Sequence, residues 1–225
     1  MLVRFVFENF RSYRDKTTFS MSAGKISRHS GHVCECNGHR LLRSAFVFGA
    51  NAGGKTSFVK ALDFGRRIVV DGALPMNMDK LNFRITSTPN TIGSFQYDIY
   101  SDGQFYSYGF AIDYSKGHVV DEWLYRLNDK NRFDVYADDF RDKAMRRELF
   151  LRDVGKRAGT ATEFGRDAAA VLRWFSRMLV IFPETRYVGL PSFMIDRKQK
   201  DATSRLMAHF DTGIDSLVEE VVDVE

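Results

Sequence analysis

The residues best suited to chemistry lie in one short glycine-rich stretch, 49–56, which ends in Lys55 and Thr56. The stretch matches the phosphate-loop pattern G-x-x-x-x-G-K-[ST] at every fixed position. In such a loop, glycines let main-chain N–H groups approach phosphate oxygens, the lysine can reach the β and γ phosphates, and the threonine hydroxyl can bind Mg²⁺. The sequence therefore predicts a nucleoside triphosphate site, with ATP and Mg²⁺ as cofactors and Thr56 as the metal-binding side chain. The predicted site residues in this stretch are Gly49, Asn51, Ala52, Gly53, Gly54, Lys55, Thr56 and Ser57.

Two flanking elements must position this loop. Residues 45–48 form a short apolar run that is typical of a buried parallel strand, and the apolar spacing after the loop favours a helix. Gly72 and Pro75 supply stop signals for that helix. Its N-terminus would add unsatisfied N–H groups and the positive end of its dipole to the phosphate site. Strand, loop and helix together predict a nucleotide-binding core over 1–72.

Other segments predict antiparallel strands and helices around this core. Residues 3–7 and 17–21 favour an opening hairpin or meander. Three aromatic-rich runs separated by turn residues, within 73–136, predict an antiparallel β meander. Residues 137–210 have helical and strongly charged character, and 211–225 alternate as the start of a strand or arm would. We therefore predict an α/β fold: a P-loop NTPase core lobe with an antiparallel β meander and a helical insertion.

A carboxylate that could support hydrolysis is harder to find. Hydrolysis on a phosphate loop needs a carboxylate at the end of an apolar strand to hold Mg²⁺. The run 179–182 is apolar, but Pro183 and Glu184 follow it and it favours the end of a helix. Glu122 is predicted to be a surface carboxylate near a turn. The catalytic residues are therefore left unassigned, and this chain alone is expected to hydrolyse little ATP.

Two cysteines lie in a polar, glycine-bearing segment, 24–40, that the composition predicts to be a loop. Cys34 and Cys36 would point to one side of an extended chain, and His32 or His39 could supply a third zinc ligand. The spacing departs from the usual C-x₂₋₄-C pattern and no second pair follows. An ordinary loop is therefore favoured over a zinc site.

Composition and charge narrow the class of protein. The 225 residues are 44% hydrophobic and 28% charged, as in ordinary globular proteins, and no apolar run is long enough to span a membrane. Two closely spaced cysteines and a charged, alternating start unlike a signal peptide predict a cytoplasmic protein. Residues 1–100 carry 14 Lys or Arg against 7 Asp or Glu, within a net charge of +4. This basic half could face a nucleotide or a nucleic acid, although a solvated surface is the simpler interpretation.

The chain resembles a known family in three motifs: FENFRSY at 7–13, TFSM at 18–21 and GANAGGKT at 49–56. They are similar to the N-terminal half of AAA-type ATPases with ABC-like heads. These are the bacterial relatives of SMC and RecF proteins found in abortive-infection and OLD-type phage-defence systems. Shorter similar pieces lie at 95–100, 106–110, 122–125, 171–175 and 211–214. The resemblance thus spans nearly the whole chain and is most specific in 5–62.

The resemblance implies that Arg11 and Ser12 lie near the nucleotide and that ATP is sandwiched between two heads of a homodimer. It also implies that an effector nuclease or toxin, or DNA, responds to hydrolysis. Family members continue into a second half with a signature serine-glycine motif, an Asp-Glu strand and a switch histidine, so this chain is predicted to be an amino-terminal half. Gly53 stands where family loops commonly have serine, which removes one hydroxyl but keeps the backbone cradle.

The preferred hypothesis is an ATP-binding lobe of an ABC-like ATPase that acts in phage defence or a DNA-related process. The alternative is a non-catalytic interaction or DNA-binding module that keeps the phosphate loop as a scaffold. Steeply salt-sensitive DNA affinity without Mg²⁺-dependent nucleotide binding would favour that alternative. A small-molecule kinase on the same loop is disfavoured, because the sequence lacks an early aspartate strand and an arginine-bearing lid.

Overall fold

The computed structural model describes residues 1–25, 29–72, 74–85, 90–127, 133–135, 147–157 and 162–182. The chain divides into two compact units, Met1–Val180 and Ile181–Glu225, and the first contains all of the helices and strands described. In chain order these are β1 (Leu2–Glu8), β2 (Thr17–Ser20), a 3-10 turn (Ser30–His32), β3 (Val33–Cys36), β4 (His39–Leu42), α1 (Lys55–Asp71), β5 (Ile92–Ser101), β6 (Gln104–Asp113), β7 (His118–Leu127), β8 (Phe133–Val135), α2 (Phe150–Arg157) and α3 (Glu163–Arg177). No helix in the described stretches is long and apolar enough to cross a membrane.

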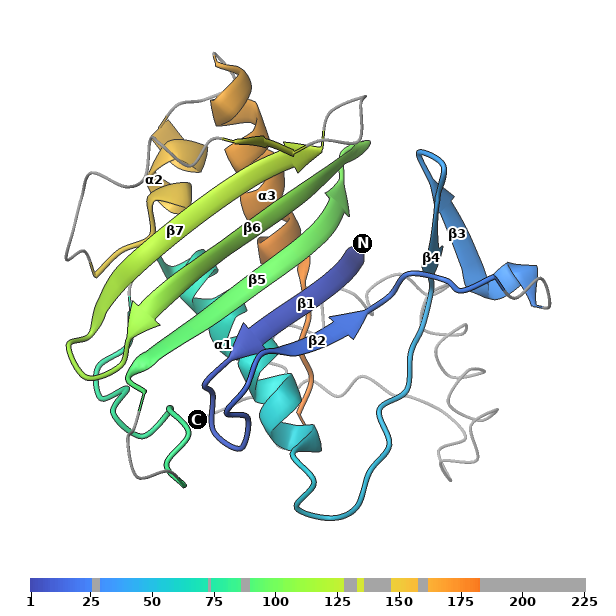
Figure 1. The fold of residues 1–225 in the computed structure, drawn as a ribbon. Helices are drawn as coiled ribbons and strands as arrows, with labels where there is room; N and C mark the ends of the chain where they lie inside the picture. Colours follow the sequence, from blue (N-terminus) through green and yellow to red (C-terminus); the bar gives the residue numbers. More distant parts are fainter. Residues whose placement is uncertain are drawn as a thin grey trace, which may run out of the picture. The chain divides into compact units, whose positions relative to one another are not determined.

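An antiparallel sheet is the centre of the first unit (Figure 1). Its six strands lie in the order β2-β1-β5-β6-β7-β8, and β3 and β4 form a separate two-stranded hairpin. Because β1 pairs with β2 on one side and with β5 on the other, the opening hairpin and the meander share one sheet. The mixed α/β class and the predicted antiparallel meander, now β5, β6 and β7, are confirmed. The predicted domain boundaries near residues 72, 136 and 210 stay predictions.

One face of the sheet carries the hydrophobic core. Helices α1 and α3 lie on this face (Figure 1). Alternation along β1 and β5 places Phe5, Phe95 and Tyr97 in the core, and each is fully buried. The Tyr97 ring contacts the ring of Phe175 in α3 edge-on, with 4.8 Å between centroids. The Tyr97 hydroxyl donates to the Leu62 carbonyl oxygen of α1 at 2.9 Å. Each such side chain contributes about 1.5–3 kcal/mol through burial, so the core fixes both helices against the sheet.

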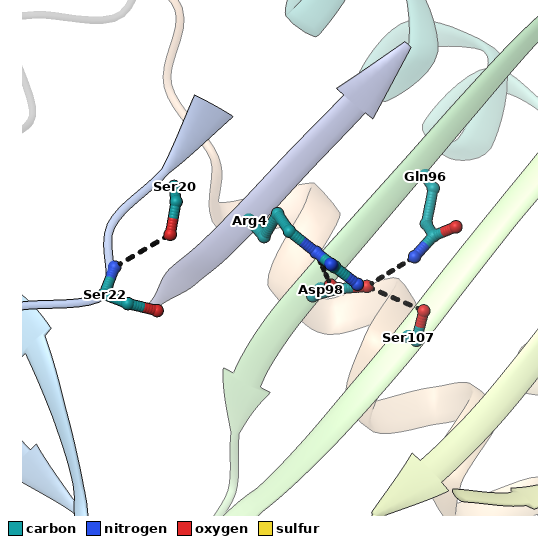
Figure 2. A network of polar contacts seen from close by, with 6 residues as sticks. All are labelled: Arg4, Ser20, Ser22, Gln96, Asp98 and Ser107. Atoms are coloured by element: carbon teal, nitrogen blue, oxygen red, sulfur yellow. Dashed lines mark hydrogen bonds and ion pairs between the residues drawn. The ribbon is translucent and has the colours of Figure 1, made fainter. Parts of the chain in front are cut away.

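The opposite face of the sheet carries a polar network around Asp98 (Figure 2). The Asp98 carboxylate is ion-paired with Arg4 and accepts hydrogen bonds from Gln96 Nε2 at 2.9 Å and Ser107 Oγ at 2.7 Å. These side chains come from β1, β5 and β6, so the network joins three adjacent strands. A buried carboxylate that is hydrogen-bonded on both oxygens in this way is part of the framework of the sheet.

Glu122 is not the surface carboxylate that the sequence predicts. It lies on β7 and is only 2% exposed. Its carboxylate accepts hydrogen bonds from the N–H groups of Phe150 (2.7 Å) and Leu151 (3.0 Å), the first two residues of α2, and from the Tyr108 hydroxyl (2.8 Å). Burial, and then the charge of Glu122, raises the pKa of Tyr108 well above its ordinary value, so this hydroxyl stays a donor. Glu122 therefore supplies an internal anion to the start of α2.

Residues 45–48 do not form the predicted buried strand. No described strand pairs with them, and Phe46 and Phe48 are 81% and 87% exposed. A strand persists only when a neighbour supplies the hydrogen bonds of its ladder. The expected parallel pairing is also not found, because all pairings between the described strands are antiparallel.

The segment 24–40 is not simply the predicted loop, because it contains β3 and the start of β4. Asn37 and Gly38 make the turn between these strands with φ angles of 45° and 78°. A two-residue hairpin turn requires such positive angles. Among the residues that the structure describes, no group of three His, Cys, Asp or Glu side chains could hold a metal, so the zinc alternative gains no support.

Part of the helical character predicted over 137–210 is found in α3, which ends at Arg177. Thr162 is its N-cap and accepts a hydrogen bond from the Gly165 N–H at 3.0 Å. The remaining predictions for this part of the chain lie outside the described residues. They are the helical character of 137–146 and 183–210, the Pro183-Glu184 step and the arm over 211–225.

Candidate phosphate-binding site

The loop 49–54 leads directly into α1, which begins at Lys55 as the phosphate-loop pattern predicts. Residues 49–53 are exposed, as is Thr56 in the first turn of the helix. Gly54 is the N-cap residue and makes no side-chain cap hydrogen bond, and the first turn holds no acidic residue. The first N–H groups of α1 therefore have neither a capping side chain nor a carboxylate within that turn. Such an N-terminus is suited to an anion.

The backbone of the loop curves back on itself. Ala52 and Gly54 have positive φ angles, 62° and 88°. The Gly53 N–H donates to the Ala50 carbonyl oxygen at 3.0 Å, and a Cβ added to Gly53 would lie 2.9 Å from that oxygen. Glycine therefore permits a close turn at position 53, where a larger residue would force the backbone to shift.

The side chain of Lys55 bends back over the loop. Its Nζ donates to the Gly49 carbonyl oxygen at 2.6 Å and to the Ala50 carbonyl oxygen at 2.7 Å. The ammonium group is thus held beside the loop and close to the start of α1. Two features that favour phosphate, a positive side chain and the positive end of a helix dipole, coincide there.

The turn that follows β1 brings two further side chains to the loop. The Tyr13 hydroxyl donates to the Gly54 carbonyl oxygen at 3.3 Å. A Cβ added to Gly54 would lie 3.2 Å from both Ser12 Oγ and the Tyr13 hydroxyl oxygen. Ser12 therefore lies beside the phosphate loop, which agrees with the resemblance, and its contact with a nucleotide stays a prediction.

Arg11 shapes this turn through its backbone. It has a left-handed φ of 52°, and its N–H donates to the Leu81 carbonyl oxygen at 2.6 Å. Its guanidinium carbon lies 5.8 Å from the centroid of the Phe10 ring. That cation–π contact is the one described for the side chain, so a place for the guanidinium beside a nucleotide stays a prediction.

Tyr13 contacts the loop but is not among the residues that the sequence predicts for the site. Its ring packs edge-on against Phe7, with 4.8 Å between centroids, and a backbone bridge to Phe10 closes the turn. Its hydroxyl is therefore fixed where it meets the loop. In the sequence, only the position of Tyr13 directly after Ser12 in the 7–13 motif indicated a role at the site. The structure shows that a tight turn brings its hydroxyl to Gly54.

Aromatic packing connects the loop to the sheet. Phe58, in the first turns of α1, contacts Phe5 of β1 with 6.0 Å between centroids and Phe19 of β2 with 5.1 Å. These contacts fix the start of α1 against the first two strands. The position of the start of α1, into which the loop leads, is therefore set by the hydrophobic core.

The described residues supply no metal-binding cluster at this loop. No three His, Cys, Asp or Glu side chains within them gather closely enough to hold an ion. Asp63, further along α1, is 7% exposed and pairs with Arg67 at 2.8 Å. It is therefore occupied within its own helix, and Thr56 stays the predicted Mg²⁺ ligand without a carboxylate partner assigned.

A groove of about 510 Å³ lies apart from the loop, lined by residues 22–25, residues 38–41 and side chains that include Asp98 and Phe105. No residue of 49–57 lines it.

No protein-family model matches this chain, and no curated protein matches it significantly. The chemistry of the site therefore has to be argued from the loop, from α1 and from the turn after β1.

Proposed function

We propose that this chain is the ATP-binding lobe of an ABC-like ATPase with a P-loop NTPase core. Residues 49–57 would cradle the triphosphate, and Thr56 would bind the Mg²⁺ that accompanies it. The observation that carries the proposal is the open start of α1: an exposed loop, an N-terminus without a cap or an acid, and Lys55 held beside it. N-termini of this kind bind phosphate because their N–H groups and their dipole both favour an anion.

Each group at the loop has a defined part in the proposal. Lys55 would neutralise the β and γ phosphates, since its ammonium group already lies over the loop. Main-chain N–H groups from Ala52 to Thr56 would donate to phosphate oxygens. Ser12 would flank the same oxygens from the neighbouring turn, and the Tyr13 hydroxyl would hold Gly54 in place. Bound Mg²⁺ would neutralise charge on the phosphates.

We further propose that hydrolysis depends on groups from a second half or a partner. A carboxylate for Mg²⁺ is not assigned among the described residues, and the apolar run 45–48 beside the loop has no strand partner there. A strand placed alongside that run would bury Phe46 and Phe48 and could carry the carboxylate. A homodimer of heads, an effector nuclease or toxin, DNA as a partner, and cytoplasmic phage defence come from the family resemblance alone and belong to the same proposal.

A titration of the purified chain with Mg·ATP tests the binding proposal. We expect saturable Mg²⁺-dependent binding that Lys55→Ala weakens about 10- to 100-fold, because a hydrogen bond to a charged group contributes about 1.5–3 kcal/mol. Lys60→Ala is the matched control, since it removes an equal charge from the same helix but not from the loop. Its affinity should equal that of the wild type.

Two results would change the proposal. Absence of Mg²⁺-dependent binding, together with DNA affinity that falls steeply with salt, would favour the non-catalytic DNA-binding module. Robust ATP turnover by this chain alone, lost in Lys55→Ala, would mean that it contains a catalytic carboxylate. The second result would leave ATP binding intact and remove only the need for a partner.

A further inference from the structure

Three sulfur atoms lie together where the strand β3 passes the first residue of the chain. Cys34 and Cys36 point to the same side of β3, because they are two residues apart on a strand, and their Sγ atoms are 3.7 Å apart. The Sδ atom of Met1, which precedes β1, lies 4.0 Å from Cys36 Sγ. Cys36 is 4% exposed and Cys34 is partly exposed, so the cluster is buried on one side and accessible on the other.

The surrounding structure fixes these atoms in place. The Met1 α-ammonium group donates to the Tyr100 carbonyl oxygen, and the Tyr100 N–H donates back to the Met1 carbonyl oxygen at 2.8 Å. A further hydrogen bond links the turn between β3 and β4 to the turn between β5 and β6, because Asn37 Nδ2 donates to the Gly103 carbonyl oxygen at 2.6 Å. The thioether and the two thiols are therefore brought together by the fold and not by chance contact of free side chains.

A disulfide within this pair is disfavoured by the strand itself. Residues two apart on a strand have Cα atoms about 6.6 Å apart, which is near the upper end of the range of about 4.4–6.8 Å found in disulfides, and a disulfide brings the sulfurs to about 2.0 Å. Closing the 3.7 Å gap between Cys34 and Cys36 would disturb the pairing of Cys36 with His39 across the hairpin. The pair is thus suited to remain as two thiols.

We propose that Cys34, Cys36 and Met1 form a binding site for Cu(I). A metal ion held in a plane by three sulfurs at about 2.3 Å, a typical metal–thiolate bond length, separates those sulfurs by about 4.0 Å. The separations of Cys36 Sγ from Cys34 Sγ and from Met1 Sδ, 3.7 and 4.0 Å, are close to that value. Thiolates with a thioether are the soft ligands that select Cu(I), whereas zinc in structural sites takes four ligands from Cys, His and carboxylates. The described residues offer no third side chain of those kinds.

Binding breaks two S–H bonds and forms two Cu–thiolate bonds, with the thioether as a neutral third ligand. Both protons pass to solvent, and the oxidation state of copper does not change.

An anaerobic titration with Cu(I), in competition with a chromogenic Cu(I) chelator, tests the site in the purified chain that begins at Met1. We expect one Cu(I) per chain. Cys34→Ser and Cys36→Ser should each weaken binding by at least about 100-fold, since loss of groups that merely orient ligands already costs about 10–100-fold. Met1→Ala, made by encoding an extra initiator methionine that is removed ahead of alanine, should weaken binding about 10-fold. In X-ray absorption spectra it should reduce three sulfur neighbours of copper to two.

Matched controls separate the site from general metal affinity. Met76→Ala removes an exposed thioether that is not part of the cluster, and His39→Ala removes the nearest histidine of the hairpin. Both should bind Cu(I) as the wild type does, and far-UV circular dichroism should be unchanged in all variants. Equal affinity in wild type and Cys34→Ser would overturn the site. An unchanged copper spectrum in Met1→Ala, or displacement of bound Cu(I) to the chelator by an equal concentration of Zn²⁺, would overturn the proposed ligand set.

Discussion

Two helices of this chain begin in opposite ways. The first N–H groups of α2 donate to Glu122, a carboxylate that is 2% exposed and comes from the neighbouring strand β7. The start of α1 has a glycine as its N-cap, no side-chain cap and no acid in its first turn, and its loop is exposed. Since every helix begins with the same unsatisfied N–H groups, the difference lies in what this fold supplies to them.

Under the proposed function, this difference separates a structural anion at α2 from a ligand site at α1. The anion at α2 is built into the core and is also bonded by the Tyr108 hydroxyl at 2.8 Å. The start of α3 is also satisfied by groups of the protein itself. The Thr162 hydroxyl accepts a hydrogen bond from the Gly165 N–H, and Glu163 lies in the first turn. At α1 the corresponding place is occupied by Lys55, a cation held against the loop. A phosphate group would complete α1 as Glu122 completes α2.

Removing the internal anion should have the largest effect on stability. Glu122→Ala leaves two N–H groups and one hydroxyl without their acceptor, and each unsatisfied buried group costs about 1–3 kcal/mol. We expect the free energy of unfolding to fall by about 3 kcal/mol or more in urea denaturation. Glu35→Ala, which removes an exposed carboxylate from β3, should change it by less than about 0.5 kcal/mol. Equal effects of the two substitutions would contradict the role given to Glu122.

Adding an anion to α1 should raise stability and lower nucleotide affinity. Ser57 is the third residue of α1, so a carboxylate in Ser57→Glu would interact with the open N-terminus and stabilise the fold by about 0.3–1 kcal/mol. The same charge should repel the triphosphate and weaken Mg·ATP binding at least about 10-fold. Ser57→Gln has the same shape without the charge and should change both quantities much less. Glu and Gln variants with equal ATP affinity would count against an anion site.

The cap of α3 should have a smaller effect, confined to stability. Thr162→Ala removes the oxygen that accepts from the Gly165 N–H, and loss of such a cap costs about 1 kcal/mol. Thr162→Ser keeps the oxygen and should recover most of that loss, with both variants measured by urea denaturation. Affinity for Mg·ATP should be unchanged in both variants. A marked loss of ATP affinity in Thr162→Ala would mean that α3 is coupled to the loop.

The hydroxyl of Tyr13 should have the smallest effect. Tyr13→Phe keeps the ring against Phe7 but removes the hydrogen bond to the Gly54 carbonyl oxygen, worth about 0.5–1 kcal/mol. We expect the free energy of unfolding to fall by no more than that amount, and Mg·ATP affinity, measured in the same titration, to fall about two- to fivefold because Gly54 is held less firmly. Wild-type affinity in Tyr13→Phe, with a loss only in Tyr13→Ala, would assign the residue to packing alone.

Short sequence patterns predicted the elements whose structure depends mainly on residues close together in the chain. The glycines before Lys55 located the start of α1 within a residue, and the periodic apolar residues located α3. The hairpin β3–β4 was missed although its signal is local: Asn37-Gly38 is the dipeptide that a two-residue turn prefers. The residues around this dipeptide are polar, and that composition led to the prediction of a loop over 24–40.

Long-range packing accounts for the remaining errors. Glu122 meets Phe150 and Leu151 only because the sheet and α2 are assembled, and nothing in its own neighbourhood indicates that contact. The run 45–48 has the composition of a buried strand, but a strand also needs a partner, and composition cannot supply one. Tyr13 reaches Gly54 through a turn whose shape depends on the backbone of Arg11.

Backbone amide NMR during a titration with Mg·ATP compares the two helix starts in one sample. If α1 is completed by phosphate, the largest chemical-shift changes should fall on the N–H groups of residues 53–57. The N–H groups of Phe150 and Leu151, already bonded to Glu122, should shift little. Lys55→Ala should reduce the changes at 53–57 at the same nucleotide concentration. Saturable binding that leaves the amides of 53–57 unmoved would contradict the assignment of α1 as the phosphate site.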